Sequence, residues 1–163
     1  MLRIAKLLPD LQLIFLVGHN AALGDRLQRL PATTPRAVVG FTPDVAELLR
    51  LGDFFIGKPG PGSLSEALHL GLPVVTIDIA WTMPQERYNA RWVREQGVGT
   101  VVPSLRALPA GVAATLLALP ALRARVAAMS NRAVYEVADI LAELLDGARE
   151  PFAQTVPGWM SVD

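Results

Sequence analysis

The sequence contains no cysteine among its 163 residues. Disulfide bonds, thiol nucleophiles and cysteine-ligated metal sites are therefore excluded, and a cytoplasmic location is favoured. An excess of one charge is also lacking, because 15 basic residues balance 15 acidic ones. A balanced chain has no strong field to attract a nucleic-acid backbone or an anionic membrane, so we expect no nucleic-acid partner.

Long apolar runs are missing as well. No uninterrupted apolar stretch approaches the roughly 18 residues that cross a bilayer, and the longest candidate is Leu13–Val17. The N-terminus shows no basic region followed by an apolar core of signal-peptide length. The chain is nevertheless 52% hydrophobic, with a mean hydropathy of +0.36. This composition excludes a disordered tail and suits one folded domain.

Five short apolar runs alternate with helical patterns along the chain. None of the runs alternates apolar with polar residues, which is typical of parallel strands buried on both faces. The expected strands are Leu11–Val17, Ala37–Val39, Phe54–Gly57, Val74–Ile77 and Thr100–Val102. The expected helices are Asn20–Leu30, Pro43–Leu51, Ser63–Leu70 and Pro84–Gln96, followed by a helical pattern from Val112 to Gly147 that is broken near Pro120. The alternation predicts an α/β fold, a Rossmann-like parallel sheet with helices on both faces.

Helix boundaries and the tail complete this outline. Thr42 is expected to cap a helix that begins at Pro43, and Gly71 and Gly97 are expected to end the helices before them. Residues 150–163 contain two prolines, a glycine and Trp159. We therefore expect one domain over residues 1–149 and an extended tail over 150–163.

The segment richest in candidate chemistry joins a strand to a helix through glycines and prolines, and reads Gly57-Lys58-Pro59-Gly60-Pro61-Gly62-Ser63-Leu64-Ser65-Glu66. Glycines let a ligand approach the backbone, and the free N–H groups of a helix start attract phosphate. The segment is neither a Walker motif, because Lys58 precedes the glycines, nor a Gly-x-Gly-x-x-Gly fingerprint. A tight connection without a ligand explains it equally well, since Ser63 and Glu66 are spaced as a capping box.

A second polar group lies near the start of the helix expected at Pro84. The spacing of Gln85 and Asn89 places both on one helix face, and Glu86 lies beside them. Amides and carboxylates are the groups that hydrogen-bond sugar hydroxyls. Taken alone, an ordinary polar first turn is the simpler interpretation.

The order of these segments resembles a known family. Along the chain come Gly40-Phe41-Thr42, the glycine turn, Gly71-Leu72-Pro73-Val74, Gln85-Glu86-x-x-Asn89 and Gly97-x-Gly99. This succession resembles the donor-binding, C-terminal half of GT-B glycosyltransferases. It is similar to monogalactosyldiacylglycerol synthases, to bacterial diacylglycerol glucosyltransferases and, more distantly, to the N-acetylglucosaminyltransferase that completes the peptidoglycan lipid precursor. The resemblance covers residues 11–103, although His19 stands where the family's Gly-Arg-Asn turn has arginine.

The resemblance implies that the ligand is a UDP-sugar, bound without a further cofactor, and it assigns a role to each of ten residues. Phe41 and Thr42 would face the uracil, Gly60, Gly62, Ser63 and Leu64 would hold the diphosphate, Glu66 would grip the ribose hydroxyls, Gln85 and Glu86 would hold the hexose hydroxyls, and Asn89 would support that loop or the phosphate.

The implied reaction is a metal-independent displacement at the anomeric carbon, with inversion, that transfers a hexose to a lipid acceptor such as diacylglycerol. The sequence has no Asp-x-Asp pair to hold a metal, which agrees with helix amides stabilising the leaving diphosphate. The general base of the family belongs to its N-terminal domain, so we assign no catalytic residue here.

The family's donor domain opens with a strand and a glycine-rich loop before the strand expected at Leu11, whereas residues 1–9 resemble the end of the helix that follows. In a sheet of order 3-2-1-4-5-6 that strand would be central. We therefore expect a fragment, inactive alone, whose open sheet edge favours a partner chain or a homodimer. Peripheral attachment to the cytoplasmic membrane face is also an expectation.

Three other hypotheses remain. The chain could be a non-catalytic donor-binding subunit of a split glycosyltransferase, with the tail around Trp159 recruiting the partner chain. It could be a sugar-nucleotide 2-epimerase, although Gln85-Glu86-x-x-Asn89 favours a transferase. It could also be a degenerate domain without a ligand. Of the remaining polar residues, Lys58 is expected either to neutralise phosphate or to be simply solvated.

Overall fold

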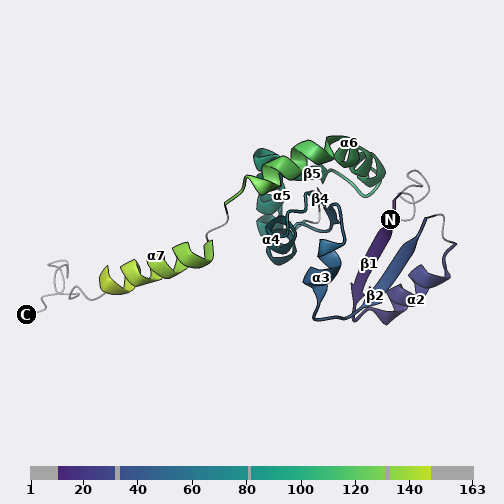
Figure 1. The fold of residues 1–163 in the computed structure, drawn as a ribbon, viewed down its shortest axis with the longest axis horizontal. Helices are drawn as coiled ribbons and strands as arrows, with labels where there is room; N and C mark the ends of the chain where they lie inside the picture. Colours follow the sequence, from purple (N-terminus) through teal and green to yellow (C-terminus); the bar gives the residue numbers. More distant parts are fainter. Residues whose placement is uncertain (1–10, 32–33, 81, 131–132, 148–163) are drawn as a thin grey trace, which may run out of the picture. The chain divides into compact units, whose positions relative to one another are not determined.

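The computed structural model describes residues 11–31, 34–80, 82–130 and 133–147. The chain divides into two units, residues 1–129 and residues 130–163, and each is described here by itself. Figure 1 shows the order of the helices and strands along the chain.

The first unit contains five strands in two parallel sheets. Strand β1 (Leu13–Gly18) pairs with β2 (Arg36–Gly40), and the register brings Gly18 opposite Gly40. Strands β3 (Phe55–Ile56), β4 (Val74–Ile77) and β5 (Gly99–Val102) form the second sheet in the order β3-β4-β5. All five expected strands are confirmed. Among the described residues the two sheets are not hydrogen-bonded to each other.

Helices follow the strands in the expected alternation. Their bounds are α2 (Ala21–Arg29), α3 (Val45–Arg50), α4 (Pro61–His69), α5 (Pro84–Gln96) and α6 (Leu108–Ala127) in the first unit, and α7 (Ala133–Gly147) in the second. Local signals set several ends. The Asn20 side chain accepts a hydrogen bond from the Leu23 amide over 3.0 Å at the start of α2, and Gly97 ends α5 with a positive φ of 63° that favours glycine.

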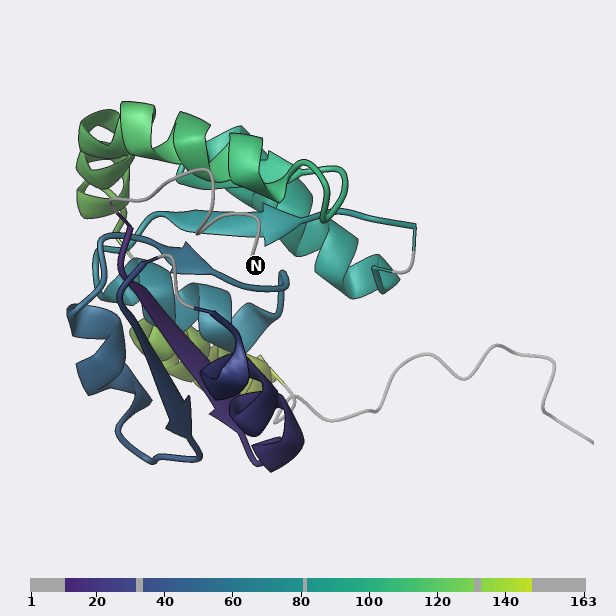
Figure 2. The same ribbon diagram turned by 90° about the vertical axis from the view of Figure 1, so that its right-hand side faces the viewer.

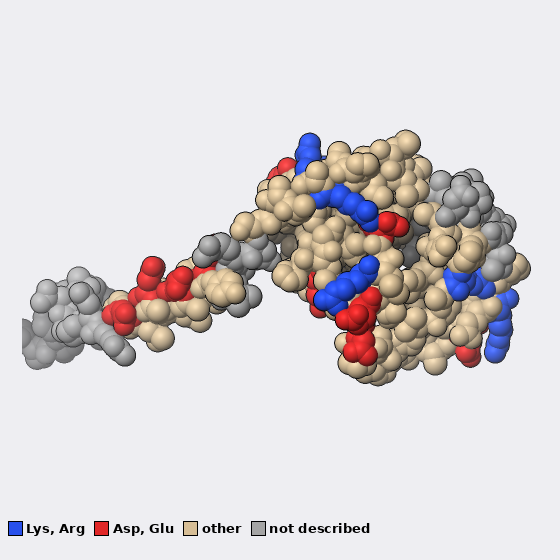
Figure 3. Space-filling model, in the orientation of Figure 1, with Lys and Arg blue, Asp and Glu red and all other residues tan. Residues whose placement is uncertain are grey.

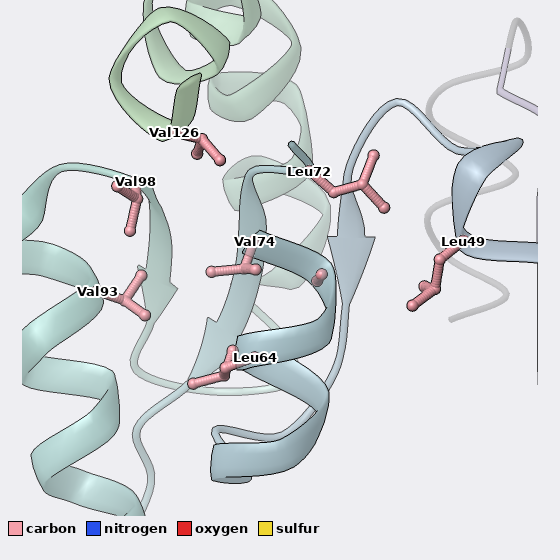
Figure 4. Close-up of a cluster of buried hydrophobic side chains, with 8 residues drawn as sticks. Leu49, Leu64, Leu72, Val74, Val93, Val98 and Val126 are labelled. Carbon is pink, nitrogen blue, oxygen red and sulfur yellow. The ribbon is translucent and has the colours of Figure 1, made fainter. Parts of the chain in front are cut away.

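The three-stranded sheet has an apolar core on each face. Successive residues of a strand point to opposite faces, and the neighbours Val74 and Val75 belong to different clusters of buried side chains. Figure 4 shows the first cluster, which comprises Leu49, Leu64, Ala67, Leu72, Val74, Val93, Val98 and Val126. The second comprises Val75, Val102, Leu108 and Val112. Helices α4 and α5 therefore cover one face and the first half of α6 covers the other, which is the predicted Rossmann-like arrangement.

Helix α6 contacts both faces of this sheet. Leu108 and Val112 pack in the second cluster, whereas Val126 packs in the first. Near its end, Arg123 Nη2 lies 2.6 Å from Asp53 Oδ1, just before β3 begins. The helix thus passes the amino ends of the strands, and its last turns bend away from the direction of its first turns (Figure 2).

The expected break near Pro120 is wrong, because α6 continues through this residue. A proline removes one helical hydrogen bond and bends the helix. Here the proline is exposed, and the buried residues Val112 and Val126 anchor the helix on either side of it. The interruption falls after Ala127 instead. By length and apolar composition α6 is the one described helix that could cross a membrane, yet its buried side chains pack on the sheet.

The charges follow the balanced composition. Figure 3 shows acidic and basic side chains interspersed over one face of the first unit, whereas α7 shows acidic ones alone. The acidic residues of α7 are Glu136, Asp139, Glu143 and Asp146, and their spacing of three or four places them along one side of the helix. The predicted tail over residues 150–163 lies outside the described residues.

Candidate functional site

The predicted site residues follow the carboxyl ends of three strands. Phe41 comes directly after β2, Gly60 comes shortly after β3, and Gln85 follows the loop after β4. Ligands of open parallel α/β sheets bind outside these carboxyl ends. The fold therefore places the predicted residues at the end of each sheet where binding is expected.

At the end of the two-stranded sheet, His19 and Phe41 stack. Their ring centroids are 4.2 Å apart and the rings are inclined by 15°. Phe41 is nevertheless 66% exposed. The register of β1 and β2 explains the contact, because Gly18 pairs with Gly40 and the residue that follows each strand carries the ring.

The predicted helix start at Pro43 is wrong. Helix α3 begins at Val45, with Asp44 as its N-cap. The hydroxyl oxygen of Thr42 accepts a hydrogen bond of 3.0 Å from the Asp44 amide instead. Threonine side chains often satisfy an amide two residues on in a turn, and this bond delays the helix. Thr42 remains in the loop that was predicted to face the uracil.

The glycine turn leads directly into α4. Gly60 is the N-cap and Pro61 is the first helical residue, so the helix begins two residues before the predicted Ser63. The Gly60 amide donates a hydrogen bond of 2.8 Å to the Lys58 carbonyl and closes the turn. The fixed φ of proline suits a first helical position. A Cβ atom added to Gly62 would meet no other atom within 4 Å, so the first turn is open at this point.

The capping box, the ligand-free alternative for Ser63 and Glu66, is absent from the start of α4. Ser63 is the third residue of the helix, and its hydroxyl donates to the Gly60 carbonyl over 3.3 Å. Glu66 is exposed, and within the described part of the chain its carboxylate has no hydrogen bond or ion pair. A capping box therefore does not explain the spacing of Ser63 and Glu66. The role of Glu66 in binding the ribose hydroxyls stays a prediction.

The start of α5 is joined to the glycine turn by two polar contacts. Asn89 Nδ2 donates a hydrogen bond of 2.9 Å to the Pro59 carbonyl. Glu86 Oε1 lies 3.2 Å from Lys58 Nζ. Asn89 was predicted to share a face with Gln85, but Glu86 is the residue that faces the turn together with it. Gln85 is exposed, and its amide nitrogen lies 3.5 Å from the Met83 sulfur.

Two residues of this region could not be placed from the sequence. The role of Lys58 was left open between binding phosphate and simple solvation. Its contact with Glu86 joins positions far apart in the chain. Arg87 was missed, although it holds the loop after β4: its Nε donates to the Thr82 carbonyl over 3.0 Å and its Nη2 to the Ala80 carbonyl over 2.7 Å. An arginine in a first helical turn after a loop is too common a pattern to have signalled this role.

Together these groups suit an anionic ligand that also carries hydroxyls. The start of α4 offers amide donors and the positive end of a helix dipole. Two carboxylates and two side-chain amides lie on α4 and α5, at Glu66, Gln85, Glu86 and Asn89. Among the described residues, no group of three histidine or acidic side chains is placed to hold a metal ion.

A comparison with known protein families identifies the family of the chain. The sequence profile of the glycosyltransferase family 28 C-terminal domain matches residues 2–144. The chain belongs to this family. The match spans both the glycine turn and the polar first turn of α5, so the family resemblance predicted from the motifs is confirmed.

Similar proteins agree with this membership. The chain is 33% identical over 96 residues to the chloroplastic monogalactosyldiacylglycerol synthase of Spinacia oleracea, covering 59% of this chain and 18% of that protein. It is 34% identical over 122 residues to the UDP-N-acetylglucosamine–N-acetylmuramyl-(pentapeptide) pyrophosphoryl-undecaprenol N-acetylglucosamine transferase of Leifsonia xyli subsp. xyli, covering 75% of this chain and 33% of that protein. A processive diacylglycerol beta-glucosyltransferase of Bacillus pumilus is 34% identical over 96 residues, covering 57% of this chain and 24% of that protein. The matches thus span between 18% and 33% of these relatives.

Proposed function

We propose that this chain is the UDP-sugar-binding domain of an inverting, metal-independent glycosyltransferase that transfers a hexose to a lipid acceptor such as diacylglycerol. The observation that carries the proposal is the hydrogen bond of 2.9 Å from Asn89 to the Pro59 carbonyl. It joins a helix start suited to phosphate to a helix turn suited to sugar hydroxyls. A nucleotide sugar presents these two chemistries side by side.

The diphosphate would lie at the start of α4. The first N–H groups of a helix have no partner within the helix, and the open space at Gly62 lets a phosphate approach them. The diphosphate site would be lined by Gly60, Gly62, Ser63 and Leu64. When the bond to the sugar breaks, negative charge grows on the leaving UDP, and preorganised amides stabilise it without a metal.

The two ends of the donor would be held by side chains. Glu66 is exposed and its carboxylate lacks a partner in the described residues, and a carboxylate has acceptor sites for both hydroxyls of a ribose. Phe41 and Thr42, on the loop after β2, would face the uracil. Gln85, Glu86 and Asn89, on the first turns of α5, would hold the hexose.

The printed names of the relatives support a lipid acceptor. One is a synthase of monogalactosyldiacylglycerol and another is a diacylglycerol glucosyltransferase. We accordingly propose a cytoplasmic location with peripheral attachment to the membrane. Fractionation of cells would contradict this if the protein resisted extraction by high salt and alkali, as a membrane-spanning protein does.

The first experiment is calorimetric titration of the chain with UDP, using the wild type, Glu66→Ala and Glu95→Ala. Glu95 is an exposed glutamate near the opposite end of α5 and serves as the matched control. We expect Glu66→Ala to weaken binding by about 1–3 kcal/mol, the usual cost of losing hydrogen bonds to a charged group. Glu95→Ala should bind as the wild type does. A folded wild-type chain that binds no UDP, with folding verified by circular dichroism, would reject the proposed donor site.

A transfer assay separates the main proposal from its alternative, a non-catalytic donor-binding subunit that needs a partner chain. Labelled UDP-galactose, UDP-glucose and UDP-N-acetylglucosamine would be incubated with diacylglycerol vesicles and the chain. The chain would be assayed by itself and together with a candidate acceptor-binding chain. Because the donor domain is expected to be inactive by itself, transfer with a separate acceptor-binding chain supports the split-subunit alternative, whereas transfer only when that acceptor-binding segment is fused to the chain supports the main proposal.

A further inference from the structure

The salt bridge between Lys58 and Glu86 links the two halves of the proposed donor site. Lys58 Nζ lies 3.2 Å from Glu86 Oε1. The two side chains differ in exposure, because 71% of the Lys58 side chain is exposed and only 11% of the Glu86 side chain is. A buried carboxylate is costly unless it is paired. Among the described residues Lys58 is the partner that Glu86 has.

The lysine lies against the glycine turn as well as against Glu86. A Cβ atom added to Gly60 would be 3.9 Å from Lys58 Cε, so the lysine side chain runs beside the N-cap of α4. The hydrogen bond from Asn89 to the Pro59 carbonyl fixes the residue after Lys58 against α5. The ammonium group is therefore held between the start of α4 and the first turn of α5.

We propose that Lys58 is a positioning residue that couples diphosphate binding to hexose recognition. This inference rests on the proposed donor site. An ammonium group has three donors, so one can remain on Glu86 while others reach a phosphate oxygen at the adjacent helix start. Without Lys58, the diphosphate and the Glu86 carboxylate would repel each other. With it, binding of the anion and orientation of the carboxylate toward the hexose support each other.

The coupling predicts a specific pattern of affinities. UDP contains the diphosphate but no hexose, so the ratio of its dissociation constant to that of the UDP-hexose measures how much the hexose adds. If Lys58 orients Glu86, its loss lowers this ratio. If Lys58 serves only as a phosphate ligand, both affinities fall together and the ratio is unchanged.

The test compares the wild type, Lys58→Met, Glu86→Gln and the double variant by calorimetry, with UDP and with the UDP-hexose that the wild type binds most tightly. Methionine keeps much of the length of lysine without its charge. We expect each single variant to lower the ratio by about tenfold, in line with loss of a hydrogen bond to a charged group, and the double variant to lower it no further. Lys58→Arg keeps the charge and should recover most of the ratio. An unchanged ratio in Lys58→Met, or additive losses in the double variant, would overturn the inference.

Thermal unfolding of the same four proteins without ligand gives an independent measurement. A salt bridge makes the effects of the two substitutions non-additive, and strictly additive changes in Tm would overturn the inference. Failure of the proposed donor site gives a different result, because the wild type then binds neither UDP nor any UDP-hexose. If the wild type binds UDP and Lys58→Met keeps the wild-type ratio of dissociation constants, the role of Lys58 is rejected but the proposed donor site is not.

Discussion

Asn89 on α5 and Pro59 on the glycine turn are 30 positions apart in the chain and are joined by a hydrogen bond of 2.9 Å. The side-chain amide of Asn89 donates and the Pro59 carbonyl accepts. Because Pro59 is fully buried, this bond satisfies a carbonyl that water could not readily reach. It fixes the distance between the two helix starts of the proposed site.

Removal of this bond should affect both folding and binding. We expect Asn89→Ala to lower the free energy of unfolding by about 1–2 kcal/mol, because it leaves a buried carbonyl without its donor, and to weaken UDP-sugar binding. Denaturant unfolding and calorimetry would measure the two effects. Gln85→Ala is the control for stability, since Gln85 is exposed and the one hydrogen bond described for its side chain is a long one to the Met83 sulfur. Equal unfolding free energies for Asn89→Ala and the wild type would contradict this role of the bond.

The substitution Gly62→Ala should leave the free energy of unfolding unchanged or raise it, while lowering the affinity for UDP. A Cβ atom there meets no protein atom within 4 Å, so Gly62→Ala should retain or raise stability, by up to about 1 kcal/mol. If a diphosphate lies against this turn, the same methyl group should weaken UDP binding by about 1–3 kcal/mol through lost hydrogen bonds to the amides.

Gly24→Ala is the matched control for that experiment. Gly24 lies within α2, outside the proposed site, and an added Cβ would make only ordinary contact, at 3.4 Å from a Val17 methyl group. Thermal unfolding and UDP titration of both variants would compare the two glycines. Wild-type affinity for UDP in Gly62→Ala would count against diphosphate binding at this turn.

Two buried threonines should respond oppositely to replacement by valine. Thr76 on β4 is 1% exposed, and its hydroxyl has no hydrogen-bond partner in the described structure. Thr115 is fully buried, and its hydroxyl lies 2.7 Å from that of Thr100 and donates to the Gly111 carbonyl over 2.9 Å. We expect Thr76→Val to raise the free energy of unfolding by about 1 kcal/mol and Thr115→Val to lower it by a similar amount. Denaturant unfolding would decide, and a loss of stability in Thr76→Val would mean that its hydroxyl is satisfied in solution.

The fold was predictable where local signals agreed with one another. Helix α5 begins at Pro84 and ends at Gln96 as predicted, because a proline at its first position and a glycine after its last both mark its ends. At α4 the predicted start was wrong. The helix was predicted to begin at Ser63, but it begins two residues earlier at Pro61, whose fixed φ suits a first helical position.

The candidate site was predictable in composition but not in its contacts. Its residues could be named because the order of the motifs resembles a family. The bonds that join α5 to the glycine turn depend on how two helices pack on one sheet, and no local pattern encodes them. The same limit applies to Pro120, which would end an isolated helix but is carried through α6 by buried residues on either side.

The path of α6 has a mechanical consequence for the first unit. Leu108 and Val112 pack in one core cluster and Val126 in the other, so a single helix contacts the three-stranded sheet on both faces. We therefore expect the helices on the two faces of the sheet to unfold together with it, as one cooperative unit. The helix crosses the sheet at the amino ends of the strands, away from the proposed donor site.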